Sequence, residues 1–160
     1  MPGQDFDAVF VSPVGRLGIR VEDGALCRLE FLSGHYRLRT ARCADTRRLQ
    51  RSILAFFADP RAVSGIECRL SGTAFQCRVW RALRRIPAGK TMTYGGMAER
   101  LGTSARAVGN ACRHNPVPIV VPCHRVVARH GPGGFAGDRQ GRLVQIKQQL
   151  LYAEGVEIRG

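Results

Sequence analysis

Cys123 and His124 are neighbours whose side chains could together form a nucleophile. A thiol attacks as its thiolate, and a nearby imidazole can remove the proton, directly or through an ordered water. The apolar residues 118–121 precede the pair and predict a buried strand, which Pro122 ends. A nucleophile at the end of a rigid strand keeps the fixed position that bond-making chemistry needs. The pair alone is weak evidence of catalysis, because most cysteines are inert residues of a core.

A glutamate near the C-terminus is a candidate partner for this imidazole. A final helix is predicted over residues 139–152, with an apolar face that includes Ile146 and Leu150. Glu154 continues that face, although the dipole at a helix C-terminus disfavours an anion. A carboxylate buried there needs a partner, and His124 is the candidate. Fraying of the helix end would instead leave Glu154 in water, and periodicity does not decide between the two.

Two short helices joined by a glycine-containing turn are predicted in the second half of the chain. The first covers residues 95–101, and Gly102 and Thr103 form the turn. Thr103 or Ser104 then caps a second helix that ends near His114. This arrangement is typical of a helix-turn-helix, although many helix pairs do not bind DNA.

The second of these helices has small side chains on one face and polar side chains on another. Arg106, Asn110 and Arg113 share one face, whereas alanines and Gly109 give the helix little bulk. Small side chains permit close approach to a nucleic-acid groove. They equally permit close packing against another helix, and both interpretations stay open.

The charge of the chain is large and uneven. Its 160 residues carry a net charge of +13, and 44% are hydrophobic. Residues 1–72 carry 11 basic and 8 acidic side chains, net +3, whereas residues 73–160 carry 14 and 4, net +10. The basic second half favours a polyanionic partner, with nucleic acid ahead of a membrane. An arginine-rich genome would give the same charge without such a partner.

The first 71 residues predict a small antiparallel sheet with one helix and no catalytic residues. Strand-like segments cover residues 8–11, 17–21 and 25–31, with turns between them. Thr46 is predicted to cap the helix, and alternation over residues 66–70 predicts a last strand.

A domain boundary is predicted at Ser71 and Gly72. It separates a scaffold domain, residues 1–71, from a second domain, residues 72–160. Thr73 and Gln76 form a capping-box pattern that opens the first helix of the second domain.

No apolar run approaches the ~20 residues that span a bilayer, and no signal peptide is recognisable. We therefore expect a cytoplasmic protein without a membrane partner. The six cysteines are scattered in mainly apolar settings, which favours free thiols over disulfides. Cys27, His35 and Cys43 fit no standard zinc spacing, so we expect no metal.

Residues 115–127, with the sequence NPVPIVVPCHRVV, resemble the active-site signature of the O6-alkylguanine-DNA alkyltransferases, also called methylated-DNA–protein cysteine methyltransferases. The resemblance extends from about Gly72 to Gly155. It implies an α+β fold, with a ribonuclease H-like N-terminal domain and a C-terminal helix-turn-helix domain that is winged-helix-like. It also implies repair of O6-alkylguanine in double-stranded DNA by irreversible transfer of the alkyl group to a cysteine. The nucleotide would be flipped out first, and no cofactor is expected.

The resemblance assigns the catalytic roles. Cys123, His124 and Glu154 match a hydrogen-bonded relay that runs through water. Asn115 matches the family's hinge asparagine. Tyr94 matches the tyrosine that helps to turn the nucleotide out and donates a proton to guanine.

The resemblance also assigns contacts to DNA and to the flipped base. Arg106 matches the arginine that intercalates from the minor groove. The other implied DNA-binding residues are Thr93, Ser104, Ala105, Ala107, Gly109, Asn110 and Arg113. The implied substrate-pocket residues are Pro118, Val126, Phe135 and Lys147. A longer segment over residues 137–142, and Asn110 in place of a glycine, depart from the more familiar members.

Two other functions are compatible with parts of this pattern. A lesion-binding protein without repair activity would share the DNA-binding region, but such relatives lack the cysteine that is present here as Cys123. A Cys-His hydrolase would turn over repeatedly, yet no oxyanion-donor set is recognisable. We expect a monomer, and cooperative assembly along DNA stays open.

Overall fold

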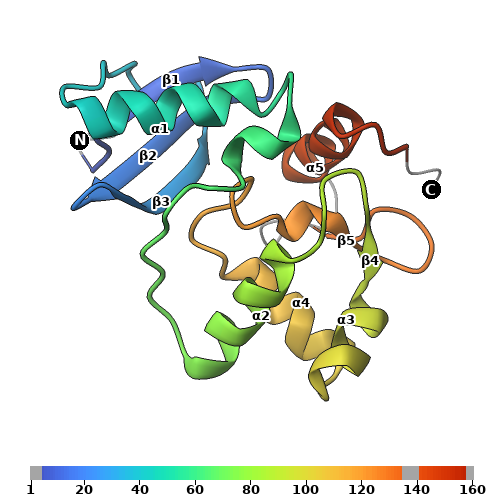
Figure 1. Cartoon of the computed structure of the whole chain (residues 1–160). Coiled ribbons are helices and arrows are strands. Elements are labelled where there is room, and N and C mark those ends of the chain that lie inside the picture. The colour runs from blue at the N-terminus through green and yellow to red at the C-terminus, as the bar shows by residue number, and fades with distance from the viewer. Residues whose placement is uncertain (1–4, 135–140, 158–160) are drawn as a thin grey trace. The chain divides into compact units, whose positions relative to one another are not determined.

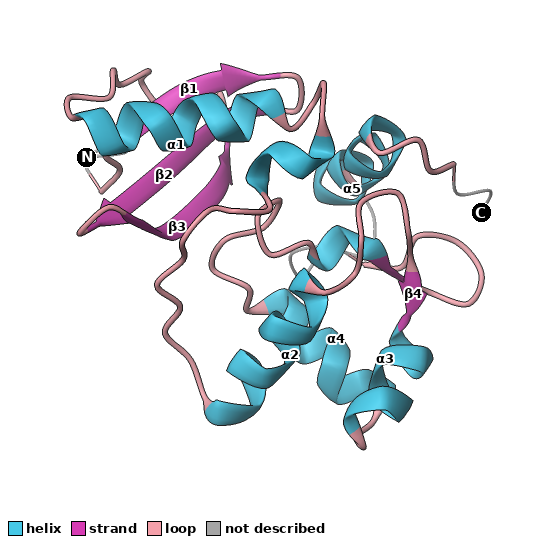
Figure 2. Ribbon diagram, viewed as in Figure 1, coloured by secondary structure: helices cyan, strands magenta, loops and turns pink. Residues whose placement is uncertain are grey.

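The computed structural model describes residues 5–134 and 141–157. Contacts within the chain divide it into two compact units, Met1–Ser71 and Gly72–Gly160 (Figure 1). The fold class is α+β, as predicted. The three-stranded sheet belongs to the first unit, whereas helices dominate the second (Figure 2).

The first unit is built on an antiparallel sheet whose strand order follows the sequence. Its strands are β1 (Ala8–Ser12), β2 (Gly15–Glu22) and β3 (Ala25–Leu32). Asp23 and Gly24 connect β2 to β3 with φ values of 50° and 79°. Positive φ at both positions is the geometry of the type I′ turn, whose twist matches that of the strands. The predicted sheet is confirmed.

Helix α1 (Ala44–Ala55) packs on β1 and β2 and buries Leu49 and Ile53. It begins earlier than predicted, with Cys43 as its N-cap residue, so the prediction that Thr46 caps it is wrong. Thr46 is buried in the first turn, where its Oγ1 lies 3.1 Å from Cys43 Sγ. Burial of the hydroxyl and its contact with the thiol explain why Thr46 does not cap the helix.

The predicted strand over residues 66–70 is also wrong. Beyond the short helix η1 (Pro60–Val63), this segment pairs with the sheet only at a parallel bridge between Leu26 and Cys68. Leu26 accepts from Arg69 N and donates to Glu67 O, each at 2.9 Å. Leu26 is the second residue of β3, so the segment meets the sheet only at its end.

The second unit contains the predicted helix-turn-helix. Helices α3 (Tyr94–Leu101) and α4 (Ala105–Arg113) contact each other. Gly102 ends α3 in the left-handed conformation, with φ 69°. Ser104 caps α4 by accepting a hydrogen bond from Ala107 N at 3.1 Å. Of the two predicted caps, Ser104 is therefore the one used.

Helix α2 (Ala74–Arg84) begins with the predicted capping box and packs against α4. Thr73 Oγ1 accepts from Gln76 N, and Gln76 Oε1 accepts from Thr73 N, both at 3.0 Å. Trp80 is buried, and its Nε1 donates to Ala111 O at 2.9 Å. This bond ties the first helix of the unit to the helix-turn-helix.

Two short parallel strands join distant parts of the second unit. In β4 (Met92–Thr93) and β5 (Val126–Val127), Met92 pairs with Val126 and Thr93 with Val127. Since β4 directly precedes α3 and β5 directly follows the Cys-His stretch, this pairing brings the start of α3 toward Cys123.

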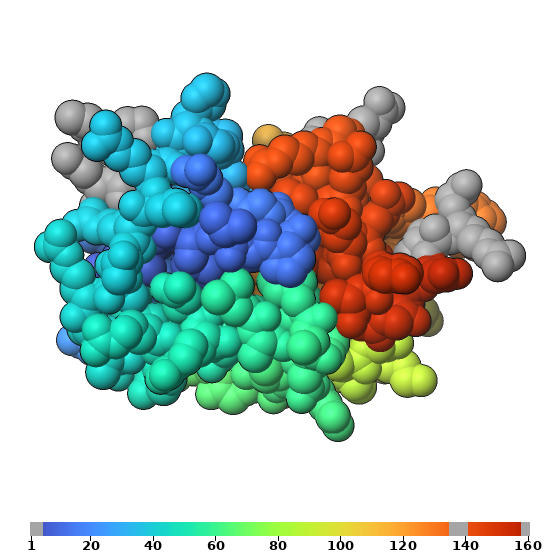
Figure 3. Space-filling model, turned by 90° about the horizontal axis from the view of Figure 1, so that it is seen from above, coloured from blue at the N-terminus to red at the C-terminus, as the bar shows by residue number. Residues whose placement is uncertain are grey.

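Helix α5 (Arg142–Ala153) closes the second unit. It contacts η2 (Cys123–Arg125), the 3-10 helix that contains the Cys-His pair. Side chains of both α1 and α5 reach the surface of their own units in the space-filling view (Figure 3). Within residues 5–134 and 141–157, no helix is both long and apolar enough to cross a membrane.

Loss of the capping box should destabilise the second unit. We expect Thr73→Ala to lower the free energy of unfolding by about 1 kcal/mol, because an N-terminal amide of α2 loses its acceptor. Urea unfolding followed by the fluorescence of Trp80, the one tryptophan of the chain, measures this effect in the second unit. Thr91→Ala, at an exposed threonine outside any helix, is the matched control and should change stability by less than about 0.5 kcal/mol. Equal effects of the two substitutions would contradict the role of the cap.

Candidate active site and nucleic-acid interface

Residues 118–121 form a buried turn, and the predicted strand is wrong. Ile119 has a φ of 75°, and Val121 N donates to Val117 O at 2.9 Å. Asn115 holds the turn closed, because its Nδ2 donates to Val121 O at 2.8 Å and its Oδ1 accepts from Val117 N at 3.0 Å. The sequence of a short apolar run does not distinguish a strand from a buried turn. Here a side-chain amide supplies the hydrogen bonds that a neighbouring strand would have supplied.

Cys123 is the first residue of η2, directly after this turn. Its backbone N donates to Val121 O at 2.8 Å, and the residue is only 4% exposed. Burial raises the pKa of the Cys123 thiol, although a hydrogen bond with Asn115 and the charge of Lys147 oppose the rise. The resting sulfur is therefore a protonated thiol at neutral pH, and it needs a base in order to react.

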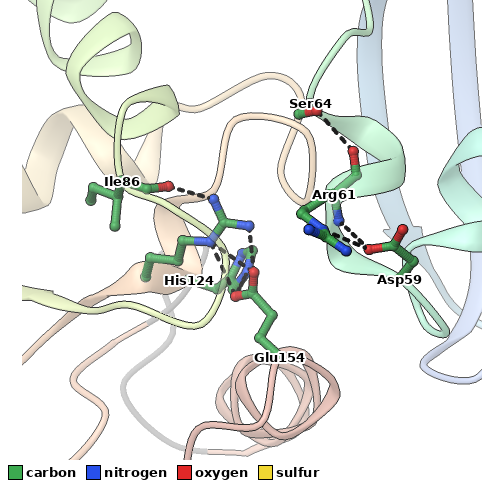
Figure 4. A network of polar contacts seen from close by, with 7 residues as sticks. Asp59, Arg61, Ser64, Ile86, His124 and Glu154 are labelled. Carbon is green, nitrogen blue, oxygen red and sulfur yellow. Dashed lines mark hydrogen bonds and ion pairs between the residues drawn. The ribbon is translucent and has the colours of Figure 1, made fainter.

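The predicted imidazole–carboxylate pair is present. His124 Nε2 and Glu154 Oε2 are 2.8 Å apart, and both side chains are 0% exposed (Figure 4). Burial lowers the pKa of His124 despite its bond to Glu154. Burial also opposes ionisation of Glu154, but hydrogen bonds from His124 and Arg125 outweigh it and leave the pKa of Glu154 below its usual value. A carboxylate only accepts hydrogen bonds, so Nε2 carries the hydrogen and Nδ1 is the basic nitrogen of His124.

Arg125 is a member of this cluster that the sequence did not identify. Its Nε donates to Glu154 Oε1 at 2.8 Å and to Oε2 at 3.1 Å, and its Nη2 also donates to Oε1. Nη1 donates to Ile86 O at 2.7 Å, the carbonyl at the left of the cluster in Figure 4. The guanidinium is 8% exposed. The available signal was that a buried, ionised carboxylate needs a full positive charge as well as an imidazole.

Tyr94 and Lys147 form a second buried cluster. Lys147 is 0% exposed, and its Nζ donates to Val126 O at 2.7 Å, Gly134 O at 2.9 Å and Tyr94 Oη at 3.3 Å. The Tyr94 hydroxyl in turn donates to Gly134 O at 3.2 Å. Burial lowers the pKa of Lys147 to about 8 and raises the pKa of Tyr94. The charge of Lys147 also acts on Cys123, which links the two clusters.

The polar face predicted on α4 is exposed. Arg106, Asn110 and Arg113 all lie at the surface, whereas Val108 and Ala111 are buried. These three side chains come from one helix face and are separate from the buried clusters.

Some of the small residues of α4 pack against neighbouring helices, which is one of the two interpretations that the sequence left open. A Cβ added at Gly109 would lie 3.9 Å from ring atoms of Tyr94, so this position packs beside the tyrosine. Ala111 is buried, and its carbonyl accepts the hydrogen bond from Trp80 Nε1. Ala105 is exposed and Ala107 half-buried, so small side chains also leave the start of α4 accessible.

The remaining candidate residues have defined places. Thr93 is exposed and caps α3, with Oγ1 accepting from Gly96 N at 2.9 Å, as Ser104 caps α4. Pro118 and Val126 are buried near Cys123 in the chain. Phe135 and most of the longer segment over residues 137–142 lie outside the described residues.

The thiols and acidic groups do not gather into a metal site in the part of the chain that is described. All six cysteines are free. Among residues 5–134 and 141–157, no group of three or more His, Cys, Asp or Glu side chains could hold a metal ion.

Comparisons with known proteins agree on one family. Residues 74–156 match the family described as 6-O-methylguanine DNA methyltransferase, DNA binding domain. The methylated-DNA–protein-cysteine methyltransferase of Mycolicibacterium paratuberculosis is 40% identical over 147 residues, which cover 86% of this chain and 89% of that protein. The enzyme of the same name from Methanosarcina acetivorans is 34% identical over 158 residues, which cover 92% and 97%.

A solved structure extends the likeness to the fold. The crystal structure of Mycobacterium tuberculosis OGT in complex with DNA matches with a TM-score of 0.70 and 31% identity, and the match covers 92% of each chain. The agreement spans both units, and it includes the residues around Cys123 and His124. The chain therefore belongs to the methylated-DNA–protein-cysteine methyltransferase family.

Proposed function

We propose that this protein repairs DNA by transferring the alkyl group from O6-alkylguanine to Cys123, once per molecule and without a cofactor. The observation that carries the proposal is the buried thiol next to an imidazole that a carboxylate orients through a 2.8 Å bond. Membership of the family, at 40% identity to a methylated-DNA–protein-cysteine methyltransferase, supports the reaction type. We further propose that it acts as a monomer in the cytoplasm.

The reaction begins with removal of the thiol proton. His124 is neutral with Nδ1 as its basic nitrogen, so Nδ1 takes the Cys123 proton through a bridging water. The sulfur then attacks the alkyl carbon, a carbon–sulfur bond forms, and the bond to O6 breaks. The electron pair of that bond passes into the guanine ring. The resulting S-alkylcysteine is a thioether with no route back to a thiol, which limits each molecule to one turnover.

Guanine becomes a better leaving group when its N3 receives a proton, and Tyr94 is the proposed donor. Its hydroxyl now donates to Gly134 O, so this bond has to be exchanged for one to the base. A phenolate buried here is costly, as the raised pKa of Tyr94 through burial indicates. The ammonium of Lys147, 3.3 Å from the Tyr94 oxygen, offsets the negative charge that develops as the proton leaves.

The substrate base has to leave the DNA helix before it can react. Extrusion of a stacked base costs a few kcal/mol, and a side chain that fills the vacated space lowers this cost. Arg106, exposed on α4, is the proposed intercalating residue, with the helix in the minor groove. Asn110 and Arg113 share its face, and Thr93, Ser104, Ala105, Ala107 and Gly109 lie on or beside the same helix pair. The solved complex of the Mycobacterium tuberculosis protein with DNA supports DNA as the partner. Residues 1–71 are proposed as scaffold.

Entry of the base requires a local opening, because Cys123 is only 4% exposed. Pro118, Val126 and Lys147 are the described residues proposed to line the pocket, and Asn115 is the proposed hinge beside it. Phe135, the fourth proposed pocket residue, lies outside the described residues. A protein that only binds lesions would need no nucleophile, so the presence of Cys123 beside His124 disfavours that alternative.

Reaction with O6-benzylguanine tests the proposed function. We expect intact-mass analysis to show one benzyl group per molecule, with no further turnover, because the thioether is stable. Cys123→Ser should give no adduct, and an adduct that survives this substitution would place the acceptor elsewhere. An unmodified parent protein would refute the function.

General thiol reagents should select a different cysteine. Cys43 is exposed, and a hydrogen bond with Thr46 lowers its pKa, whereas burial raises the pKa of Cys123. We expect iodoacetamide at neutral pH to modify Cys43 well before Cys123, as peptide mass mapping over time would show. Faster modification of Cys123 would mean that its thiolate forms without the substrate.

Substitution of Arg106 should separate duplex repair from thiol chemistry. We expect Arg106→Ala to slow repair of O6-methylguanine in duplex DNA by about tenfold or more. Without the arginine, no side chain fills the space that the flipped base leaves in the stack. Its reaction with free O6-benzylguanine should match that of the parent, since no stack has to be opened. Repair rates of labelled duplex and free base, measured side by side, decide the point. An equal loss of rate on both substrates would contradict the proposed intercalating role of Arg106.

A further inference from the structure

Glu154 binds two side chains of η2 at once. The guanidinium of Arg125 contacts both carboxylate oxygens, and the imidazole of His124 contacts Oε2 at 2.8 Å. All three side chains are nearly or wholly buried, at 8%, 0% and 0% exposure. A contact of Arg125 with Ile86 O, at 2.7 Å, holds the guanidinium from the other side.

The charges of this cluster have opposite effects on the protonation of the His124 imidazole. A buried carboxylate alone beside an imidazole would favour its protonated form. An imidazolium is useless as a base, because its ring nitrogens already carry their protons. The charged groups that act on the pKa of His124 are Glu154, the C-cap residue of α5, Lys147 within α5 and Arg125 from η2. Arg125 pairs directly with the carboxylate, so the pair is electrically balanced before His124 is counted.

We infer that Arg125 is a positioning residue of the alkyl-transfer site, which balances the charge of Glu154 so that the carboxylate orients His124 without keeping it protonated. The inference rests on the proposed function, because it concerns the base of that reaction. It agrees with burial as the main reason that the pKa of His124 is low, with the charges of Arg125 and Lys147 acting in the same direction. The Glu154 bond acts against them and supplies orientation.

This role differs measurably from a purely structural one. A clamp that only holds α5 against η2 would, when lost, slow alkylation equally at every pH. Loss of charge balance raises the pKa of His124, so a larger fraction of the base is protonated at neutral pH. Activity is then lost below the raised pKa and recovered above it, where the imidazole is again neutral.

Titration of His124 by NMR tests the inference without reference to alkyl transfer. The chain has four histidines, and His124→Gln identifies the signal of His124. We expect Arg125→Gln to raise its titration midpoint by about one unit or more, the shift that one close charge produces. Arg125→Lys keeps the positive charge and should leave the midpoint near that of the parent. Arg81→Gln, at an exposed arginine of α2, removes one charge away from the site and is the matched control.

Benzylation rates of the same variants across pH give the second readout. For Arg125→Gln we expect a loss that is about twofold to fivefold greater near pH 6.5 than near pH 8.5, following the fraction of neutral imidazole. Arg125→Lys should follow the parent profile. Trp80 fluorescence reports whether each variant is folded, and if Arg125→Gln does not fold, the midpoint in Arg125→Met is measured instead.

The outcomes separate this inference from the proposed function. An unchanged midpoint in the folded Arg125→Gln protein, or a rate loss that is equal at all pH values, would overturn the role of Arg125 while benzylation of the parent still supported alkyl transfer. Absence of benzylation in the parent would overturn the function, whereas the titration of His124 would still stand.

Discussion

The carboxylate of Glu154 sits at the C-terminal end of α5, where it has to be neutralised because a lone buried charge is costly. Its partners, His124 and Arg125, are consecutive residues of η2. The hydrogen bonds therefore hold the end of α5 against the helix that contains the proposed nucleophile, Cys123. They also prevent the fraying that would have left Glu154 in water. One ionic cluster thus settles the helix terminus, the orientation of the imidazole and its tautomer.

The surroundings of Cys123 keep its thiol unreactive until a base is engaged. Asn115 closes the preceding turn through Val121 O and also acts to lower the pKa of the Cys123 thiol. Burial outweighs this effect and the charge of Lys147, so the thiol stays protonated. If Cys123 is consumed in one reaction, as proposed, such a resting state limits its modification by other electrophiles. The exposed Cys43 has no such protection.

The short parallel pairing of β4 with β5 brings distant segments of the second unit together. Because β4 ends where Tyr94 begins α3, and β5 starts where η2 ends, their pairing brings the proposed acid and the proposed nucleophile to the same region. Lys147 then joins Tyr94 to the carbonyl of Val126 in β5. On α4 a single helix presents Arg106 outward while Gly109 packs beside the Tyr94 ring. The exposed helix face and the buried clusters are thus built on shared elements.

Local chemistry was readable from the sequence alone. The capping box of Thr73 and Gln76, the turn at Asp23 and Gly24, and the left-handed Gly102 each depend on residues a few positions apart. Helical periodicity placed Glu154 on the apolar face without deciding whether it would be buried, and the Cys-His signature indicated the family. Tertiary structure decided the rest. The turn over residues 118–121 exists because Asn115 replaces a strand partner, and Thr46 lost its capping role because it is buried. Arg125 joined the site because Glu154, twenty-nine residues later in the chain, needs its charge, and such long-range electrostatic pairing leaves no periodic mark in a sequence.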